Sequence, residues 1–422
     1  MRLYQMALLT FAPMVSLCAA GVTPKDVREM AKAGPNAIPK MQQLLKNQDL
    51  DVRIEAVKQI TALGTVRSLE PLVLATQDND PEMQVRATDG LVNFYLPGYL
   101  QTGLGASIKR VGTSIKGKFS ETNDQEIDPY VTVRPEVIEA LGKLARGGGD
   151  LQARANAARA VGILHGKAAV PDLVETLHTK DTDLIYESLN ALQKIRDESA
   201  SPRITFLLRD LNPKVQITAI ETTGLLQNKQ ALPDLVDALN RARDIKVRRA
   251  ALTAIARLPA ESSRQLYVRY LTDKDDKMRT AAAEGYARLR SSGDLPVLEK
   301  AWKDEGKTSS RLGLGFAQVM LGKTDRGEFS PFTYLINTLN SASYKDVALA
   351  YLTELARDER VRRALYQPLE SGTKDEKIGL AGVLGQSGDK DTVPHLEKIS
   401  TDSNGDVAQA GLRALRTLRS RL

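Results

Sequence analysis

A helical hairpin recurs along this sequence at intervals of about 31 residues, and this repeat restricts the possible folds more than any other feature. Segment 232–258 (LPDLVDALNRARDIKVRRAALTAIARL) shows one complete unit. Leu232, Leu235 and Leu239 place one apolar stripe on a first helix, and the part from Val247 onward repeats the pattern for a second helix. One hairpin cannot bury both stripes, so it needs neighbours of its own kind.

Two independent features return the same period. Segment 170–177 (VPDLVETL) nearly duplicates segment 232–239 (LPDLVDAL), two periods further along the chain. In the second helix, a Val-Arg or similar pair begins at residues 52, 85, 215, 247, 278 and 407. The predicted fold is therefore all-α, a solenoid of about eleven helical hairpins between residues 37 and 420.

The second-helix pattern, seen in Asp51-Val52-Arg53 through Gly64, resembles the short HEAT-like repeats that are also found in phycobilisome-lyase proteins. The resemblance covers residues 37 to 420 and indicates almost nothing about activity. It implies a right-handed α-solenoid whose second helices line the concave side. Gly313, Gly315 and Gly322 leave one hairpin with fewer side chains to pack, so we expect looser packing or a hinge over residues 307–331.

The first twenty residues are predicted to be a secretory signal. Arg2, an apolar run over residues 6–17 and the small residues before Ala20 are typical of such signals, so we expect cleavage near Ala20 and a periplasmic or secreted protein. A lipid-anchored chain and an uncleaved or unexported chain are the alternatives. Because Cys18 is the only cysteine, the mature chain would lack disulfides, cysteine-ligated zinc and thiol catalysis.

An insertion interrupts the repeats. The period places a first helix near residue 100, but the next recognisable one begins at Pro135. We therefore divide the chain into a signal peptide (1–20), a capping helix (21–36), repeats (37–96), the insertion (97–133) and further repeats (134–422). Tyr130–Val133 (YVTV) is the one plausible strand in the sequence.

The insertion separates by charge into a basic half and an acidic half. Its basic half has one apolar stripe at helical spacing, and glycines make that helix marginal unless it packs against something. Docking on the solenoid, binding a partner protein and lying on a membrane surface are the three alternatives. The candidate interaction surface consists of Leu104, Ile108, Lys109, Arg110, Val111, Ile115, Lys116, Lys118 and Phe119.

Arginines at the start of the second helices are a further candidate. The densest basic cluster consists of Arg241, Arg243, Lys246, Arg248 and Arg249. Arginines of the repeated pair (Arg53, Arg86, Arg154, Arg248, Arg279) could bind an anion, but we favour a structural role. In it, a turn aspartate such as Asp51, Asp150 or Asp244 caps one helix and pairs with the arginine of a neighbouring layer.

Candidate catalytic residues are few. The three histidines, His165, His178 and His395, occur in no metal-binding pair, and we expect neither a metal nor a cofactor. A formal net charge of +7, with 59 basic and 52 acidic residues interspersed, makes nucleic acid an unlikely partner. We therefore predict a non-enzymatic scaffold in the cell envelope that binds protein partners. The alternatives are a membrane-peripheral adaptor that binds through the insertion and, from the resemblance, a chromophore-lyase-like enzyme.

Overall fold

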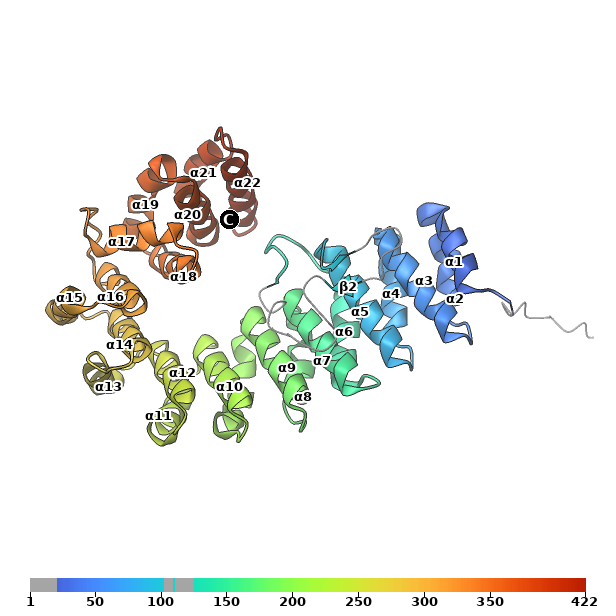
Figure 1. The fold of residues 1–422 in the computed structure, drawn as a ribbon, viewed down its shortest axis with the longest axis horizontal. Coiled ribbons are helices and arrows are strands. Elements are labelled where there is room, and N and C mark those ends of the chain that lie inside the picture. Colours follow the sequence, from blue (N-terminus) through green and yellow to red (C-terminus); the bar gives the residue numbers. More distant parts are fainter. Residues whose placement is uncertain (1–20, 102–108, 111–124) are drawn as a thin grey trace, which may run out of the picture. The chain divides into compact units, whose positions relative to one another are not determined.

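The computed structural model describes residues 21–101, 109–110 and 125–422, which are almost entirely helical (Figure 1). The predicted signal peptide lies outside these residues. The described part of the chain contains eleven helical hairpins, which confirms the prediction of an all-α solenoid. The chain divides into two compact units, Met1–Thr113 and Ser114–Leu422, and each is described by itself. None of the helices in the described ranges combines the length and apolar character that crossing a membrane requires.

The first unit contains a short helix and two hairpins. Helix α1 (Pro24–Ala31) begins at Thr23, whose hydroxyl accepts a hydrogen bond from the Asp26 N–H as predicted for an N-cap. The hairpins pair α2 (Ile38–Leu44) with α3 (Leu50–Leu63) and α4 (Leu69–Ala75) with α5 (Pro81–Tyr95). Helix α1 packs on α3, so it covers the first hairpin as expected.

The second unit contains nine hairpins. The first segments of its hairpins are α6 (Pro135–Gly147), α8 (Val170–Thr176), the 3₁₀ turns at 198–209, α11 (Leu232–Arg241), α13 (Arg264–Tyr270), α15 (Leu295–Asp304), α17 (Pro331–Asn337), α19 (Glu359–Ser371) and α21 (Val393–Ile399). The second helices are α7 (Leu151–Ile163), α9 (Thr182–Ile195), α10 (Pro213–Leu225), α12 (Ile245–Ala256), α14 (Asp276–Leu289), α16 (Thr308–Met320), α18 (Lys345–Leu355), α20 (Lys374–Ser387) and α22 (Gly405–Arg419).

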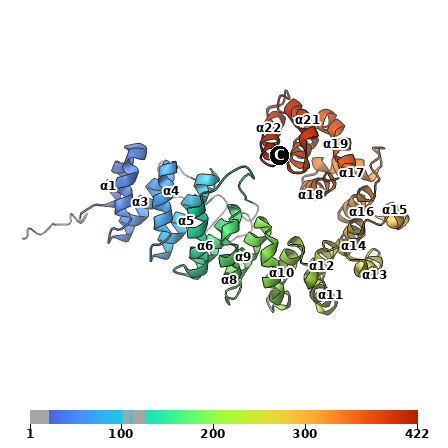
Figure 2. The same ribbon diagram turned by 180° about the vertical axis from the view of Figure 1, so that it is seen from behind.

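Second helices stack directly on one another within each unit. Helices α11, α13 and α15 lie on one side of the stack formed by α12, α14 and α16 (Figure 1), and Figure 2 shows the same arrangement from behind. Most of the stripe residues are buried, as the hairpin pattern requires. Within each unit, we call the side of the second helices that faces away from the first helices the inner surface.

Small residues let consecutive second helices approach closely. A Cβ atom on Gly162 would lie 2.7 Å from the Ala191 Cα, and a Cβ atom on Gly385 would lie 2.9 Å from the Ala414 Cα. Gly224 and Ala254 repeat this contact between α10 and α12. At these positions only a hydrogen fits between the two helix backbones, so glycine sets the distance between layers.

The prediction of looser packing over residues 307–331 is wrong for α16. This helix is continuous, and a Cβ atom on Gly313 would lie 3.0 Å from the Thr280 Cγ2 and 3.1 Å from its carbonyl oxygen. The glycine thus serves close packing against α14 rather than flexibility. After α16 the chain turns at Gly322, which has a φ of 106°, and leaves Phe329 82% exposed.

Both described ends of the insertion lie against the repeats of their own unit. At the first end, Leu100 is buried and its N–H donates to the Asn93 Oδ1 of α5 at 2.9 Å. Strand β1 (Leu100–Gln101) pairs antiparallel with strand β2 (Lys109–Arg110). The strand predicted at Tyr130–Val133 is wrong, because those residues form a turn and an irregular segment.

Candidate interaction surface

The primary candidate surface falls mostly on residues that the structure does not describe. Leu104, Ile108, Val111, Ile115, Lys116, Lys118 and Phe119 all lie outside the described residues. Lys109 and Arg110 are described, and they form β2 instead of part of a helix. The prediction of one amphipathic helix across this segment is therefore wrong at these two positions, where backbone pairing with β1 competes with helical hydrogen bonds.

The acidic end of the insertion docks on α7 and α9 within the second unit. A carboxylate oxygen of Glu126 lies 3.1 Å from the His165 Nε2, and the Lys194 ammonium donates to the Gln125 carbonyl oxygen at 2.9 Å. The Ile127 N–H donates to the Ile163 carbonyl oxygen at 3.1 Å, and the Ile127 side chain is buried. For residues 125–127, these contacts agree with the reading in which the insertion docks on the solenoid.

The electrostatics at this docking point favour an ionised carboxylate. Burial raises the pKa of Glu126, but the hydrogen bond to His165 and the charges of His165, Lys194 and Arg196 outweigh it and lower the pKa overall. The Nδ1 atom of the same imidazole lies 3.2 Å from the Lys194 carbonyl oxygen. His165 therefore joins the insertion to two successive second helices, a role that its position near a helix end did not predict.

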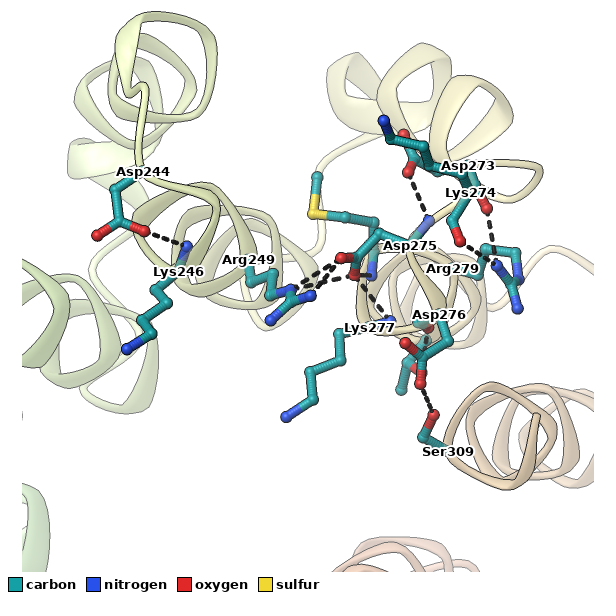
Figure 3. A network of polar contacts seen from close by, with 12 residues as sticks. Asp244, Lys246, Arg249, Asp273, Lys274, Asp275, Asp276, Lys277, Arg279 and Ser309 are labelled. Carbon is teal, nitrogen blue, oxygen red and sulfur yellow. Dashed lines mark hydrogen bonds and ion pairs between the residues drawn. The ribbon is translucent and has the colours of Figure 1, made fainter.

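The basic side chains at residues 241–249 do not form one site, because neighbouring acidic side chains pair with some of them. Arg241 pairs with Asp237 at 2.6 Å, and the Arg249 Nε donates to both carboxylate oxygens of Asp275 at 3.1 Å (Figure 3). The Lys246 ammonium points away from Arg249 (Figure 3). The remaining members, Arg243 and Arg248, are exposed and half-buried respectively. This cluster consists of structural pairs and rim charges, and it does not converge on a common point.

Arginines near the start of the second helices join consecutive hairpins. Arg53 donates to Asp78 at 3.0 Å, and Arg279 donates to Glu305 at 2.7 and 2.9 Å. Each also donates to backbone carbonyl oxygens of the preceding turn, as Figure 3 shows for Arg279. These two arginines thus join consecutive layers as the structural role requires, but their partners, Asp78 and Glu305, are not the N-caps of the next helices.

Not every member of the arginine series follows that scheme. Arg86 pairs with Glu82 on its own helix, Arg154 donates to the Ala145 carbonyl oxygen, and the Arg248 guanidinium lies 3.4 Å from the Tyr270 hydroxyl. Asp150 and Asp244 cap their helices as predicted. The cap of α3 is Asp49, and Asp51 lies inside the first turn of that helix.

A second basic position on the second helices was missed by the sequence analysis. Nine residues after the Arg248 and Arg279 positions stand Arg257 and Arg288, and Lys194 occupies the same position two periods before Arg257. The repeat period contains this signal, because a base recurs nine residues after the first arginine of these units. Lys194 and Arg288 lie in the last turns of α9 and α14, and Arg257 directly follows α12.

Arg288 joins three second helices on the inner surface of the second unit. Its guanidinium donates to Glu354 on α18 at 2.9 and 2.8 Å, to Glu284 on α14 at 3.1 Å and to the Ala256 carbonyl oxygen on α12 at 3.3 Å. The Tyr351 hydroxyl completes the group by donating to Glu284 at 2.6 Å. Burial raises the pKa of that phenol, so it stays a neutral donor. Residues 66 apart in the sequence are therefore held together.

Three more arginines gather beside this network. Arg257 follows Ala256, Arg357 follows Glu354 by one turn, and Arg196 ends α9 in the left-handed conformation with a φ of 58°. Burial lowers the pKa of Arg196, and the charges of Arg257 and Arg357 lower it further. In the part of the chain that the structure describes, no hydrogen bond or ion pair joins these three guanidinium groups to a carboxylate. We call Arg196, Arg257 and Arg357 the inner arginine group.

The inner arginine group offers planar donors suited to carboxylate or phosphate oxygens. Across the described ranges, no three histidine, cysteine, aspartate or glutamate side chains gather in a way that could hold a metal ion. Glu221 on α10 lies near Arg257, and burial raises the pKa of its carboxyl group. The surface is thus a mixed one with a local excess of positive charge.

Comparison with known proteins identifies the repeat. Residues 232–311 match the family model of HEAT repeats, which supports the resemblance noted in the sequence. Among curated proteins, no sequence matches the chain. The solved structures that the chain matches include an engineered protein, with 18% identity over 90% of this chain and 98% of that chain and a TM-score of 0.38. They also include the complex of CpcE and CpcF of phycocyanin lyase from Nostoc sp. PCC7120, with 16% identity over 80% and 99% and a TM-score of 0.34. A third is Escherichia coli YibA, with 15% identity over 70% and 94% and a TM-score of 0.40.

Proposed function

We propose that this solenoid, whose residues 232–311 are HEAT repeats, is an exported, non-enzymatic scaffold that binds a protein partner along the inner surface of its second unit. Stacked repeats present one extended surface, and partners bind such a surface by contacting several repeats at once. Under this proposal the protein has no catalytic site, cofactor or metal, and it functions in the cell envelope.

One observation carries the proposal. On the inner surface Arg288 of α14 joins α12 and α18, and the charges of Arg257 and Arg357 act on Arg196 at the end of α9, so groups from four different hairpins interact. The Arg288 network fixes three of these helices, so the surface beside it is preorganised. A preorganised surface loses little entropy on binding, which favours the recognition of a partner.

Affinity capture with a matched pair of variants tests the scaffold. The tagged chain would be used as bait in the envelope fraction, beside a variant in which Arg196, Arg257 and Arg357 are replaced by glutamate. The control variant replaces three exposed bases of first-helix segments by glutamate, namely Arg203, Lys229 and Lys300. We expect a protein that is captured by the wild type and the control variant but is lost with the inner variant.

A different result would reject the scaffold. If both variants capture the same proteins in the same amounts, the inner surface has no part in binding. If reproducible turnover of a small substrate accompanies the purified chain, the protein is an enzyme. The export proposal has its own test, because N-terminal sequencing of the protein from fractionated cells should begin near Gly21 and the protein should leave the cytoplasm. An intact Met1 in the cytoplasmic fraction would contradict it.

A further inference from the structure

We infer that the inner arginine group binds an acidic segment of the protein partner, with the three guanidinium groups of Arg196, Arg257 and Arg357 donating to its glutamate or aspartate carboxylates. This inference rests on the proposed function and specifies the chemistry of the partner. It concerns a surface that the arginines at the helix starts do not reach.

The geometry of the Arg288 network brings the group together. Since Arg288 contacts both the Ala256 carbonyl oxygen and the Glu354 carboxylate, the chain segments just after α12 and α18 lie on either side of one guanidinium. Arg257 and Arg357 belong to these two segments. Packing against Phe316, which stacks on Tyr351 with 4.6 Å between ring centroids, fixes α16 between them. The positions of these two arginines are therefore set by a rigid network.

Three of the nearby carboxylates are already engaged, and Glu221 is the exception. Glu284 accepts hydrogen bonds from Arg288 and Tyr351, Glu354 accepts two from Arg288, and Glu126 pairs with His165. Their charges are largely balanced where they stand. The positive charges of the inner arginine group repel one another and favour an incoming anion. Arg196 and Arg357 are exposed and Arg257 is half-buried, so a carboxylate-bearing segment can reach all three charges and accept hydrogen bonds from them.

The surrounding charges favour an acidic peptide over a nucleic acid. Glu221 and Glu354 lie on the same inner surface as the arginines, so a continuous phosphate backbone would meet negative charge between the positive sites. A peptide places its carboxylates at intervals and can leave neutral side chains opposite these glutamates. The planar guanidinium also matches a carboxylate in a two-hydrogen-bond geometry.

Fluorescence anisotropy with labelled peptides tests the inference on the full mature chain. The probes are a short glutamate-rich peptide, the same peptide with glutamine in place of glutamate, and a single-stranded oligonucleotide of equal charge. We expect the glutamate peptide to bind, and the variant with R196Q, R257Q and R357Q to bind it at least about tenfold more weakly. Glutamine suits the backbone at residue 196, because Gln227 adopts the same left-handed conformation with a φ of 55°.

A second variant should change the peptide affinity in the opposite direction, and misfolding could not produce that increase. E221Q removes the competing carboxylate near Arg257, so the glutamate peptide should bind more tightly to it than to the wild type. Equal binding of the glutamate and glutamine peptides, tighter binding of the oligonucleotide, or unchanged affinity in the triple glutamine variant would each overturn the inference. If the glutamate peptide does not bind while affinity capture still depends on the inner surface, the proposed scaffold function is retained. Only the inference that the partner segment is acidic is then rejected.

Discussion

Two glycines of α20 differ in their surroundings, one being closely packed and the other open. Replacing each in turn therefore distinguishes the effect of close packing from that of helix propensity. A Cβ atom on Gly385 would lie 2.9 Å from the Ala414 Cα, whereas a Cβ atom on Gly382 would meet nothing within 4 Å. Gly385→Ala should therefore destabilise the protein by about 1–3 kcal/mol, because the two helices must move apart. Gly382→Ala should stabilise it by about 0.5–1 kcal/mol, since alanine is the better helix former.

Urea unfolding followed by circular dichroism measures both changes. The two variants alter the same helix by the same methyl group, so the difference in unfolding midpoint reports the environment alone. A loss of stability in Gly382→Ala as large as that in Gly385→Ala would mean that glycine does not set the layer spacing here.

A single carboxylate should contribute to the acid sensitivity of the fold. Burial raises the pKa of Glu305, but the hydrogen bonds from Arg279 and the Lys307 N–H lower it more, to about 2. The folded pKa is thus below the unfolded pKa, so the stabilisation is fully present above about pH 4.5 and is lost as the pH falls toward about 2. Because 18% of the Arg279 side chain is exposed to solvent, which screens the pair, we expect about 1–2 kcal/mol.

Thermal unfolding at a series of pH values checks this linkage. The wild type should lose more stability between pH 5 and pH 3 than Glu305→Gln, which carries no titrating group at this position. A parallel fall of the two melting temperatures would show that the Arg279–Glu305 pair has no part in acid sensitivity.

Single side chains also show which contacts the sequence could predict. Thr23, Asp150 and Asp244 were predicted as N-caps and are N-caps, because a cap depends only on the next three residues. The inner arginine group was missed, because Arg196 and Arg357 are 161 residues apart in the sequence and interact electrostatically only through the stacking of hairpins. Periodicity assigns a side chain to a face, but it does not give the distance between faces of distant layers.

Between elements, a buried ion pair connects α7 and α9. The Arg159 guanidinium donates to both oxygens of Glu187 at 3.0 and 2.9 Å, and the two side chains are only 2% and 1% exposed. Glu187→Gln leaves the guanidinium charge buried without its carboxylate, so it should destabilise the protein by about 3–5 kcal/mol. Hydrogen exchange should increase mainly in α7 and α9.

The control replaces both partners by apolar residues. Arg159→Met combined with Glu187→Leu removes both buried charges, so most of the lost stability should return. If the double variant is as unstable as Glu187→Gln, the pair contributes hydrogen bonds that packing cannot replace. Chemical denaturation of the three proteins distinguishes these outcomes.

The sequence predicted helices and strands correctly where its apolar pattern was periodic and incorrectly where it was not. The hairpins were predicted because apolar stripes and turns recur every 31 residues or so. The insertion was misread at two points, since Lys109 and Arg110 form a strand and Tyr130–Val133 does not. Short nonperiodic segments take the structure that their neighbours allow, and local propensity alone does not determine it.

Within the second unit, the Arg288 network departs from the energetics expected of a repeat protein. Stability of a solenoid is ordinarily a sum of terms for single repeats and for adjacent pairs. Arg288 and Glu354 join α14 to α18, which belong to hairpins that are not adjacent, and α16 lies between them. A third helix, α12, is included through the Ala256 carbonyl oxygen. Four hairpins of the second unit should therefore unfold more cooperatively than adjacent contacts alone would require.

Glu354→Gln tests this coupling between nonadjacent layers. The variant weakens the hydrogen bonds to Arg288 without changing the size of the side chain, so hydrogen exchange should increase in α14 and α18 together. The control is Arg209→Gln, which loses an exposed ion pair with Asp234 in a neighbouring hairpin, and it should leave exchange in both helices unchanged. Faster exchange confined to α18 would show that α14 is held by its adjacent layers alone. Faster exchange in both helices would show that a charged side chain transmits stability across an intervening repeat, and that the surface beside the inner arginine group owes its rigidity to this connection.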